Sequence, residues 1–290
     1  MKPIAENVVI QIEIINGCIL ACANCTRHVG HHRKPFIMTL DEIATAIASL
    51  EDFPGRIGCM GGEPAMHPKF KEVLALYRGM IPDRRRREFW TTGWKWYDYL
   101  GDIQRTFDSD LIHVNDHTQK TGRHQPLLIA SEDVIPDAAL REELIDDCWV
   151  QRQWSASITP KGAFFCEVAA SLHHLFGGPD GWKIEPGWWK RIPADYGSQR
   201  DYACNKCSAA IPMETRSDAR GGRDPSIDVV SPGNLARLKA MGSPKIARNN
   251  YEVFSKILER EDLNKEGWTP SKFRDFIAHS PEDIEKALSE

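Results

Sequence analysis

Three cysteines near the N-terminus, followed by a glycine-rich run, restrict this sequence more than any other feature. Cys18, Cys22 and Cys25 have the spacing C-x3-C-x2-C, and the run Gly61-Gly62-Glu63-Pro64 comes after them. Three thiolates can hold three irons of a cubane [4Fe–4S] cluster, whereas four would close it. The fourth iron then stays open to a ligand, as the vacant position of a catalytic metal site does. Such a cluster can pass an electron directly into the molecule that it binds.

The secondary structure predicted around these motifs places both of them on loops that follow strands. Residues 8–15 are β-branched and apolar, which predicts a buried strand, and Gly17 ends it. The cysteines lie in the loop up to Thr39, which forms a capping box with Glu42 and opens a helix to about residue 50. Residues 56–60 are a second predicted strand. The glycine-rich run follows it, so both motifs fall on the face where barrel enzymes place their sites.

The alternation of strands and helices continues along the chain. It matches an α/β fold, a partial (β/α)6 TIM-like barrel whose open side would admit a bulky substrate. Further strands are predicted at residues 89–91, 111–115, 126–131 and 153–158, and helices at residues 69–80, 95–107 and 137–146.

The two motifs resemble those of the radical S-adenosylmethionine (SAM) enzymes, and that family has the same partial barrel. The resemblance implies that Cys18, Cys22 and Cys25 are the catalytic ligands of the cluster. It also implies that Gly61-Gly62-Glu63-Pro64 binds SAM, with the carboxylate of Glu63 on the amino group of the methionine. The residue before the third cysteine is usually aromatic in the family and is Asn24 here.

The ends of the later strands supply further candidates. Thr91 and Thr92 precede a glycine and resemble the Thr-Asn-Gly-like turn of the family, which implies contact with SAM. Asn115 and Ser131 follow the fourth and fifth predicted strands, where barrel enzymes place cofactor contacts. The histidines that follow the cysteines are expected to cap the cluster or to meet the substrate. They are His28, His31 and His32.

Four more cysteines lie in the C-terminal half. A hairpin is predicted over residues 154–166, with its turn at residues 160–162 and a helix after it. This pattern resembles the Twitch or abbreviated SPASM extension of radical SAM enzymes, although the spacing from the hairpin glycine to its cysteine is about one residue short. The resemblance implies an auxiliary [4Fe–4S] cluster with four protein ligands. Those ligands are Cys148, Cys166, Cys204 and Cys207.

Zinc is the alternative at both groups of cysteines, because x2 and x3 spacings also bind zinc. A zinc motif does not predict Gly-Gly-Glu-Pro on the next loop, so the cluster is favoured at the first group. At the second group structural zinc stays open. Cys148 is either a ligand or a free thiol able to donate a hydrogen atom, and Cys59 is interpreted as a core residue.

Composition narrows the class of protein. The chain has 290 residues, a net charge of −4 and 41% hydrophobic residues, and no apolar stretch long enough for a membrane helix. A cytoplasmic enzyme is therefore expected, with no membrane partner and nucleic acid disfavoured. The run of arginines at residues 84–87 is interpreted as a solvated loop.

Three regions are predicted. Residues 1–147 form the radical SAM core, and residues 148–210 form the sixth strand and the auxiliary extension. Residues 211–290 form a tail with a loop at 216–226 and short helices. Those helices are predicted at residues 235–241, 251–260, 272–278 and 282–288.

The predicted function is reductive cleavage of SAM to a 5′-deoxyadenosyl radical, which abstracts a hydrogen atom from a carbohydrate-like or other small polar substrate. The outcome would be dehydrogenation or epimerisation, with a reducing partner such as flavodoxin or ferredoxin. One alternative is a radical SAM enzyme that modifies ribosomal peptides (RiPP maturase type). The alternative from another class is a zinc-binding interaction protein without catalysis.

Overall fold

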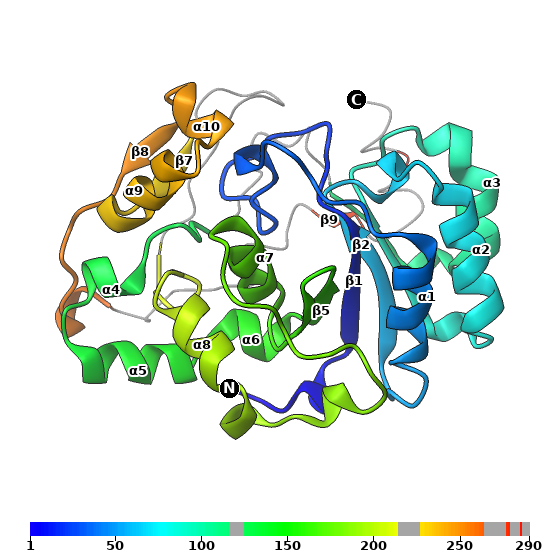
Figure 1. The fold of residues 1–290 in the computed structure, drawn as a ribbon, viewed down its shortest axis with the longest axis horizontal. Helices are drawn as coiled ribbons and strands as arrows, with labels where there is room; N and C mark the ends of the chain where they lie inside the picture. The colour runs from blue at the N-terminus through cyan, green and yellow to red at the C-terminus, as the bar shows by residue number, and fades with distance from the viewer. Residues whose placement is uncertain (116–124, 214–226, 264–276, 279–284, 286–290) are drawn as a thin grey trace.

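The structure is a computed structural model, and it describes residues 1–115, 125–213, 227–263, 277–278 and 285. Its centre is a seven-stranded sheet with the order β6-β5-β1-β2-β3-β4-β9 (Figure 1). The five inner strands are parallel, and the two outer strands are antiparallel to their neighbours. The strands are β1 (Val9–Ile15), β2 (Arg56–Gly61), β3 (Arg87–Thr91), β4 (Ile112–Asn115), β5 (Ala156–Thr159), β6 (Gly162–Phe164) and β9 (Ile277–Ala278).

The first three strand–helix units form as the sequence predicts. Helices α1, α2 and α3 lie on one side of the sheet, and α6 and α7 lie on the other (Figure 1). The predicted capping box is present, because the hydroxyl of Thr39 accepts from the backbone N–H of Glu42 at 3.2 Å and the Glu42 carboxylate accepts in return at 2.7 Å. These helices are α1 (Leu40–Ala48), α2 (Phe70–Met80) and α3 (Trp96–Thr106).

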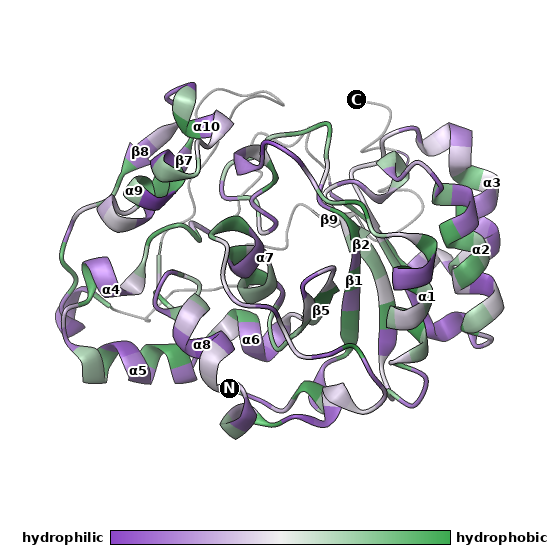
Figure 2. Ribbon diagram, in the orientation of Figure 1, coloured by the Kyte–Doolittle hydropathy of each residue, from purple (hydrophilic) through white to green (hydrophobic). Residues whose placement is uncertain are grey.

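Strand β1 carries polar as well as apolar buried residues. Its isoleucines alternate with Gln11 and Glu13, and all of these side chains are buried. Figure 2 shows this alternation between hydrophobic and hydrophilic residues along the strand. Successive side chains of a strand point to opposite faces, so one face of the sheet packs on helices while the other presents polar groups.

The predicted fifth strand, at residues 126–131, is wrong. Leu128 makes only an isolated bridge to Val230, and the segment has no place in the central sheet. Its backbone is satisfied by the C-terminal segments instead: Ser208 donates its hydroxyl to the carbonyl of Pro126 at 2.6 Å, and Ala130 N–H donates to Ser231 at 2.9 Å. The helices α4 (Ser131–Val134) and α5 (Ala138–Asp146) follow this segment. Helix α5 is the helix predicted at residues 137–146, and Asp137, directly after Pro136, caps its N-terminus.

The predicted sixth strand forms, but later and in another place. Residues 149–153 are the short helix α6 (Trp149–Gln153), and β5 then pairs with β1 rather than extending the sheet beyond β4. The position beyond β4 belongs to β9. The strands of the described residues therefore form an open sheet that is not in the consecutive order of a (β/α)6 barrel.

The hairpin predicted after the sixth strand is confirmed. Strands β5 and β6 pair in antiparallel fashion, with Thr159 opposite Gly162. Gly162 has a φ of 117°, and a Cβ there would lie 2.6 Å from the carbonyl of Trp182, so glycine is required. Helix α7 (Glu167–Leu175) follows directly, and α8 (Gly197–Cys204) packs against it.

The C-terminal segment contains strands where the sequence predicts helices. Tyr251–Val253 is strand β8, which pairs in parallel with β7 (Asp228–Val230), so the predicted helix at 251–260 is wrong. The predicted helix at 235–241 is α9 (Pro232–Ala240), and α10 (Pro244–Ala247) follows it. The end of the predicted helix 272–278 is strand β9. The loop 216–226, the rest of 272–278, and all of 282–288 except residue 285 lie outside the described residues.

Candidate functional site

The two N-terminal motifs touch each other at the C-terminal ends of β1 and β2. The backbone N–H of Gly62 donates to the carbonyl of Ile15 at 2.8 Å, and that of Glu63 donates to Gly17 at 2.7 Å. A Cβ on Gly61 would lie 2.3 Å from the Ile15 oxygen, and one on Gly62 would lie 2.4 Å from the Gly17 oxygen. The glycines are therefore needed where the two loops meet, a reason that the sequence alone did not give.

The three N-terminal thiols lie together in the loop after β1. All are partly buried. Burial, with a contribution from Cys25, raises the pKa of the Cys18 thiol to about 12, and burial together with Cys18 and Cys25 raises the pKa of Cys22. Their electrostatic influence on one another shows that the thiols are close. Thiols of this kind lose their protons when a metal binds and neutralises the negative charge.

Glu63 is completely buried, and its carboxylate is already hydrogen-bonded. Its oxygens accept from Thr91 Oγ1 at 2.9 and 3.0 Å, from Thr92 N–H at 2.6 Å, from Thr92 Oγ1 at 2.7 Å and from Ala65 N–H at 3.0 Å. Burial raises the pKa of Glu63, while these donors oppose the rise. Thr91 and Thr92 therefore orient the carboxylate of Glu63. The resemblance implies contact with SAM for all three residues.

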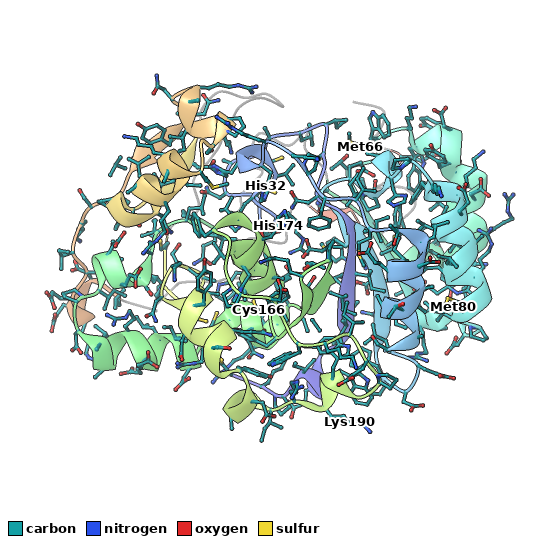
Figure 3. All side chains as sticks on the ribbon, in the orientation of Figure 1. His32, Met66, Met80, Cys166, His174 and Lys190 are labelled. Atoms are coloured by element: carbon teal, nitrogen blue, oxygen red, sulfur yellow. The ribbon has the colours of Figure 1, made fainter. Side chains whose placement is uncertain are left out.

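The four later cysteines also gather in one place, although they come from different elements. Cys148 precedes α6 and Cys166 precedes α7 (labelled in Figure 3), while Cys204 and Cys207 lie at the end of α8 and just beyond it. Burial raises the pKa of all four thiols, that of Cys207 to about 12. Cys148 raises the pKa of each of the other three, so it lies within the group.

Neither group has the arrangement of a site for a single metal ion. Among the described residues, no three His, Cys, Asp or Glu side chains are placed so that they could share one ion.

The other predicted site residues are spread over the fold. Ser131 donates its hydroxyl to the carbonyls of Cys204 and Asn205, at 3.1 and 3.2 Å, so it lies beside the later cysteines. Asn115 ends β4 and pairs with Ile277. Pro64 begins a short 3-10 turn over Pro64–Met66, directly after Glu63.

A buried ion cluster that the sequence analysis missed joins the two cysteine groups. The guanidinium of Arg27 lies 2.9 Å from the carboxylate of Glu167 and 3.5 Å from that of Glu13. Arg27 is the second residue after Cys25, and Glu167 directly follows Cys166. Burial alone would lower the pKa of Arg27, but the two carboxylates raise it, so the cation is kept. The signal in the sequence was the position of two opposite charges next to the cysteines of each group.

The three histidines tie the cysteine loop to distant elements. His28 Nδ1 lies 2.7 Å from the hydroxyl of Ser171 on α7, and His31 lies between Asp228 and Ser243, at 2.9 and 2.8 Å. The ring of His32 lies 4.7 Å from that of His174, and Figure 3 shows the pair side by side.

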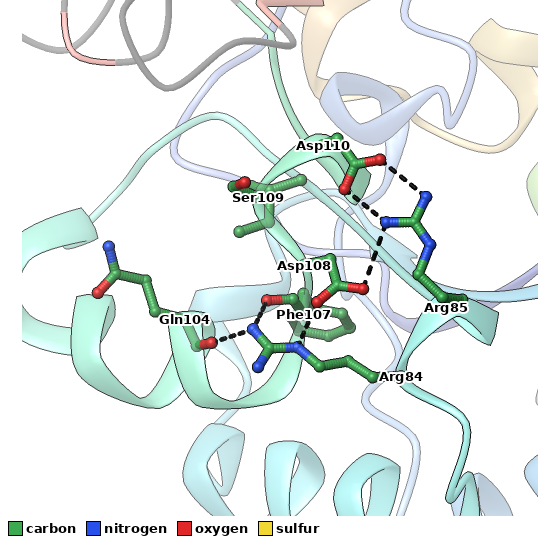
Figure 4. A pocket seen from close by; sticks show the side chains of 8 residues that line it. Arg84, Arg85, Gln104, Phe107, Asp108, Ser109 and Asp110 are labelled. Carbon is green, nitrogen blue, oxygen red and sulfur yellow. Dashed lines mark hydrogen bonds and ion pairs between the residues drawn. The ribbon is translucent and has the colours of Figure 1, made fainter.

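The arginine run is solvated only in part, because Arg85 is exposed and Arg84 is partly exposed, whereas Arg86 and Arg87 bond to the protein. Arg86 donates to the carbonyls of Leu50 and Glu51, at 3.0 and 2.9 Å, and Arg87 is buried. Arg84 and Arg85 are paired with carboxylates beside a pocket of about 490 Å³ (Figure 4). The pocket adjoins Ile112, which begins β4, so it lies at the end of the sheet opposite to the cysteines. It is lined by Arg84, Arg85, Gln104, Phe107, Asp108, Ser109, Asp110 and Ile112.

A pH dependence of stability follows from Asp228. Burial alone would raise its pKa, but Lys245 and His31 lower it to about 2. A carboxylate with a lowered pKa stabilises the folded state above its unfolded pKa of about 3.9, and the contribution is lost as the pH falls toward 2. In urea unfolding of the metal-free protein, the gap in unfolding free energy between the wild type and Asp228→Asn should shrink by about 2 kcal/mol from pH 6 to pH 2. A gap that is constant over this range would contradict the assignment.

Comparisons with known proteins give a partial likeness in backbone arrangement. No protein-family profile matches the sequence, and no curated protein matches it. One similar solved structure is BtrN in an open conformation, with 18% identity and a TM-score of 0.36 over 56% of this chain and 70% of that one. Another is BtrN in complex with AdoMet and 2-DOIA, with 14% identity and a TM-score of 0.42 over 69% of this chain and 88% of that one. In the described part of this chain, no helix is both long and apolar enough to cross a membrane.

Proposed function

We propose that this protein is a radical SAM enzyme that oxidises a carbohydrate-like or other small polar substrate. The observation that carries the proposal is the contact between the C-x3-C-x2-C loop and the Gly-Gly-Glu run, made through the backbone bonds of Gly62 and Glu63. Cys18, Cys22 and Cys25 would hold a [4Fe–4S] cluster and leave one iron position open. When bound, the cluster supplies the electron for reductive cleavage of SAM and so for hydrogen-atom abstraction. A flavodoxin or ferredoxin would supply that electron.

The residues of this chain would bind and orient SAM. Glu63 is the acceptor proposed for the ammonium group of its methionine, because a buried carboxylate forms strong charge-assisted hydrogen bonds. Thr91 and Thr92 fix the direction of that carboxylate. Their hydroxyls can rotate, which would free an oxygen of Glu63 for the ligand.

The distribution of the cysteines favours oxidation over epimerisation. An epimerisation needs a hydrogen donor, which would be a free thiol. Of the eight cysteines, three belong to the first group and four to the second. The eighth, Cys59, is fully buried on β2 and lies against Tyr77. Four thiols in one group suit a closed auxiliary cluster that accepts an electron.

A polar substrate is supported by the inner face of the sheet. Glu88 on β3 accepts from Trp90 Nε1 at 2.6 Å and from Gln11 at 3.4 Å, and it lies 3.8 Å from His113 on β4. The ring of His113 lies 4.4 Å from that of Trp90. Glu88 is also paired with Arg56 at 2.6 Å and is almost fully buried, so the polar and aromatic character of this face supports a polar substrate rather than Glu88 as a free binding group.

The test is SAM binding and cleavage by the iron-loaded protein. With dithionite, the wild type should form 5′-deoxyadenosine from SAM. Glu63→Gln and Glu63→Ala should weaken SAM binding by about 1.5–3 kcal/mol, roughly 10- to 150-fold, because each removes a charged acceptor. Both variants should keep their iron. Affinity can be measured by equilibrium dialysis, with the exposed Glu72→Gln as the matched control.

Two outcomes would contradict the proposal in different ways. Iron-loaded protein that forms no 5′-deoxyadenosine would overturn the function. Unchanged SAM affinity in both Glu63 variants would show that Glu63 does not bind SAM. The proposed function would then rest on the cysteines alone.

A further inference from the structure

The loop that carries the three cysteines has little secondary structure of its own. Residues 16–38 are all described, and their one helical element is the 3-10 turn Val29–His31. A loop of this length needs contacts from elsewhere to keep three thiols in one geometry. Those contacts come from the C-terminal segment, and Figure 1 shows α10 and β7 beside the loop.

Two buried side chains of that segment reach the loop between the cysteines. The Asp228 carboxylate accepts from the backbone N–H of Asn24 at 2.5 Å, and the Lys245 ammonium donates to the carbonyl of Cys22 at 2.8 Å. The two side chains pair with each other at 2.6 Å, and both are almost fully buried, with 1% and 3% exposed. The Asp228–Lys245 pair therefore binds one backbone N–H and one backbone carbonyl of the cysteine loop. The pair lies more than 200 residues after that loop in the sequence.

We propose that Asp228 and Lys245, the C-terminal clamp, are positioning residues for the cluster held by Cys18, Cys22 and Cys25. The proposal rests on the proposed function, since it assigns the clamp to that cluster. The clamp holds the segment between Cys22 and Cys25 in place, and the Lys245 ammonium supplies a buried positive charge beside an anionic site.

The conformation of Asn24 is fixed by contacts with the C-terminal segment. Asn24 has a φ of 50°, a left-handed conformation that asparagine adopts more often than most residues other than glycine. It is held there from both sides, because its N–H donates to Asp228 and its side-chain oxygen accepts from the N–H of Val229 at 3.3 Å. An aromatic residue, as the family resemblance expects before the third cysteine, could not make the second bond. The polar residue at this position is therefore matched to β7.

The burial of the pair points to positioning in addition to its contribution to stability. Taking two charges out of water costs nearly as much as their attraction returns, so a buried pair is often no better than apolar residues of the same size. Here the pair does what apolar residues could not, because it bonds to the backbone of the loop. Asp228 lies on β7, in the separate two-stranded sheet of β7 and β8, and Lys245 lies on α10 (Figure 1).

The first experiment uses the metal-free full chain, so it does not depend on whether a cluster binds. Each cysteine is alkylated with iodoacetamide at pH 8, and rates are read by peptide mass spectrometry. Asp228→Asn should raise the rates of Cys22 and Cys25 about tenfold or more, the effect of losing a buried charged hydrogen bond. Lys245→Met should raise the rate of Cys25 in the same way. Cys22 is not compared in that variant, because loss of the Lys245 cation also raises the pKa of the Cys22 thiol and slows its alkylation. Cys204 and Cys207 should not change. Lys256→Met, which removes an exposed pair with Asp262, should leave every rate unchanged.

A conservative variant separates positioning from a general loss of structure. Lys245→Arg keeps the cation and should restore protection of Cys25. In reconstituted protein, Lys245→Met should lower the reduction potential of the cluster that responds to SAM, whereas Lys245→Arg should not. Unchanged alkylation at Cys25 in both clamp variants would overturn the proposal. An equal rise at all eight cysteines that persists in Lys245→Arg would also overturn it, because it would show a general loss of structure. Cysteines that the clamp protects but that never bind iron would refute the proposed function, and with it the assignment of the clamp to a cluster, while the clamp's hold on the loop would still be shown by the alkylation rates.

Discussion

Anaerobic reconstitution with iron and sulfide should give a brown protein with about eight irons per chain, four in each of two cubane clusters. The reason is the division of the cysteines into a group of three and a group of four that lie on separate elements. Iron and acid-labile sulfide analysis, with electron paramagnetic resonance after reduction, would measure this. The signal of the three-cysteine cluster should change when SAM is added, because only that cluster has an open position.

Cysteine variants should separate the two clusters. Replacing Cys18, Cys22 and Cys25 with Ala should abolish SAM cleavage and leave about four irons. Replacing Cys204 and Cys207 should also leave about four irons, but with the response to SAM intact. Cys59→Ala is the matched control and should keep all eight, because Cys59 is buried on β2 outside both groups. A colourless protein with stoichiometric zinc would end the radical SAM proposal, and about four irons in the wild type would remove only the auxiliary cluster.

The first half of the fold could be predicted because its signals are local. The β-branched run of β1, the capping box at Thr39 and the proline before α5 each depend on a few neighbouring residues. The hairpin of β5 and β6 was also predictable, since its turn needs Gly162 in a conformation that suits glycine. Local patterns of this kind determine the secondary structure of a segment regardless of where that segment packs in the fold.

The errors fall where distant segments decide the structure. Residues 126–131 are apolar enough for a strand, but their hydrogen bonds go to Ser208 and Ser231, which no local pattern reveals. Residues 251–253 form a strand because β7 lies beside them. Strand order is also non-local, and the pairing of β5 with β1 depends on the whole sheet.

The candidate site shows the same division. The cysteines and the Gly-Gly-Glu run were found from spacing, and the structure brings them into contact. The partners that orient them were not found from spacing. Thr92, which the resemblance assigns to SAM, also bonds Glu63, and Lys245 reaches the carbonyl of Cys22 from the C-terminal segment of the chain. Such charges carry no sequence signal, since a buried lysine looks like any other lysine until its partner is known.

The ion cluster around Arg27 gives the largest expected effect on stability. Arg27→Met should lower the free energy of unfolding of the metal-free protein by about 3–5 kcal/mol, because it leaves two buried carboxylates without a cation. Glu13 and Glu167 are only 1% and 4% exposed. Urea unfolding at pH 7.5 measures the loss. Arg105→Met is the matched control, since Arg105 pairs with Asp102 on the surface and should cost at most about 1 kcal/mol.

The origin of the loss can be checked by charge and by pH. Burial raises the pKa of Glu13 and Arg27 lowers it, so without Arg27 the carboxylate takes up a proton more readily. A raised pKa in the folded state makes the defect shrink as the pH falls, and Arg27→Met should therefore be closer to wild type at pH 5 than at pH 8. Replacing Glu13 and Glu167 with Gln in the same variant should recover much of the loss at pH 8. Because Arg27 follows Cys25 and Glu167 follows Cys166, iodoacetamide should also reach both of these thiols faster in Arg27→Met. A cost no greater than that of Arg105→Met would show that the cluster does not join the two groups.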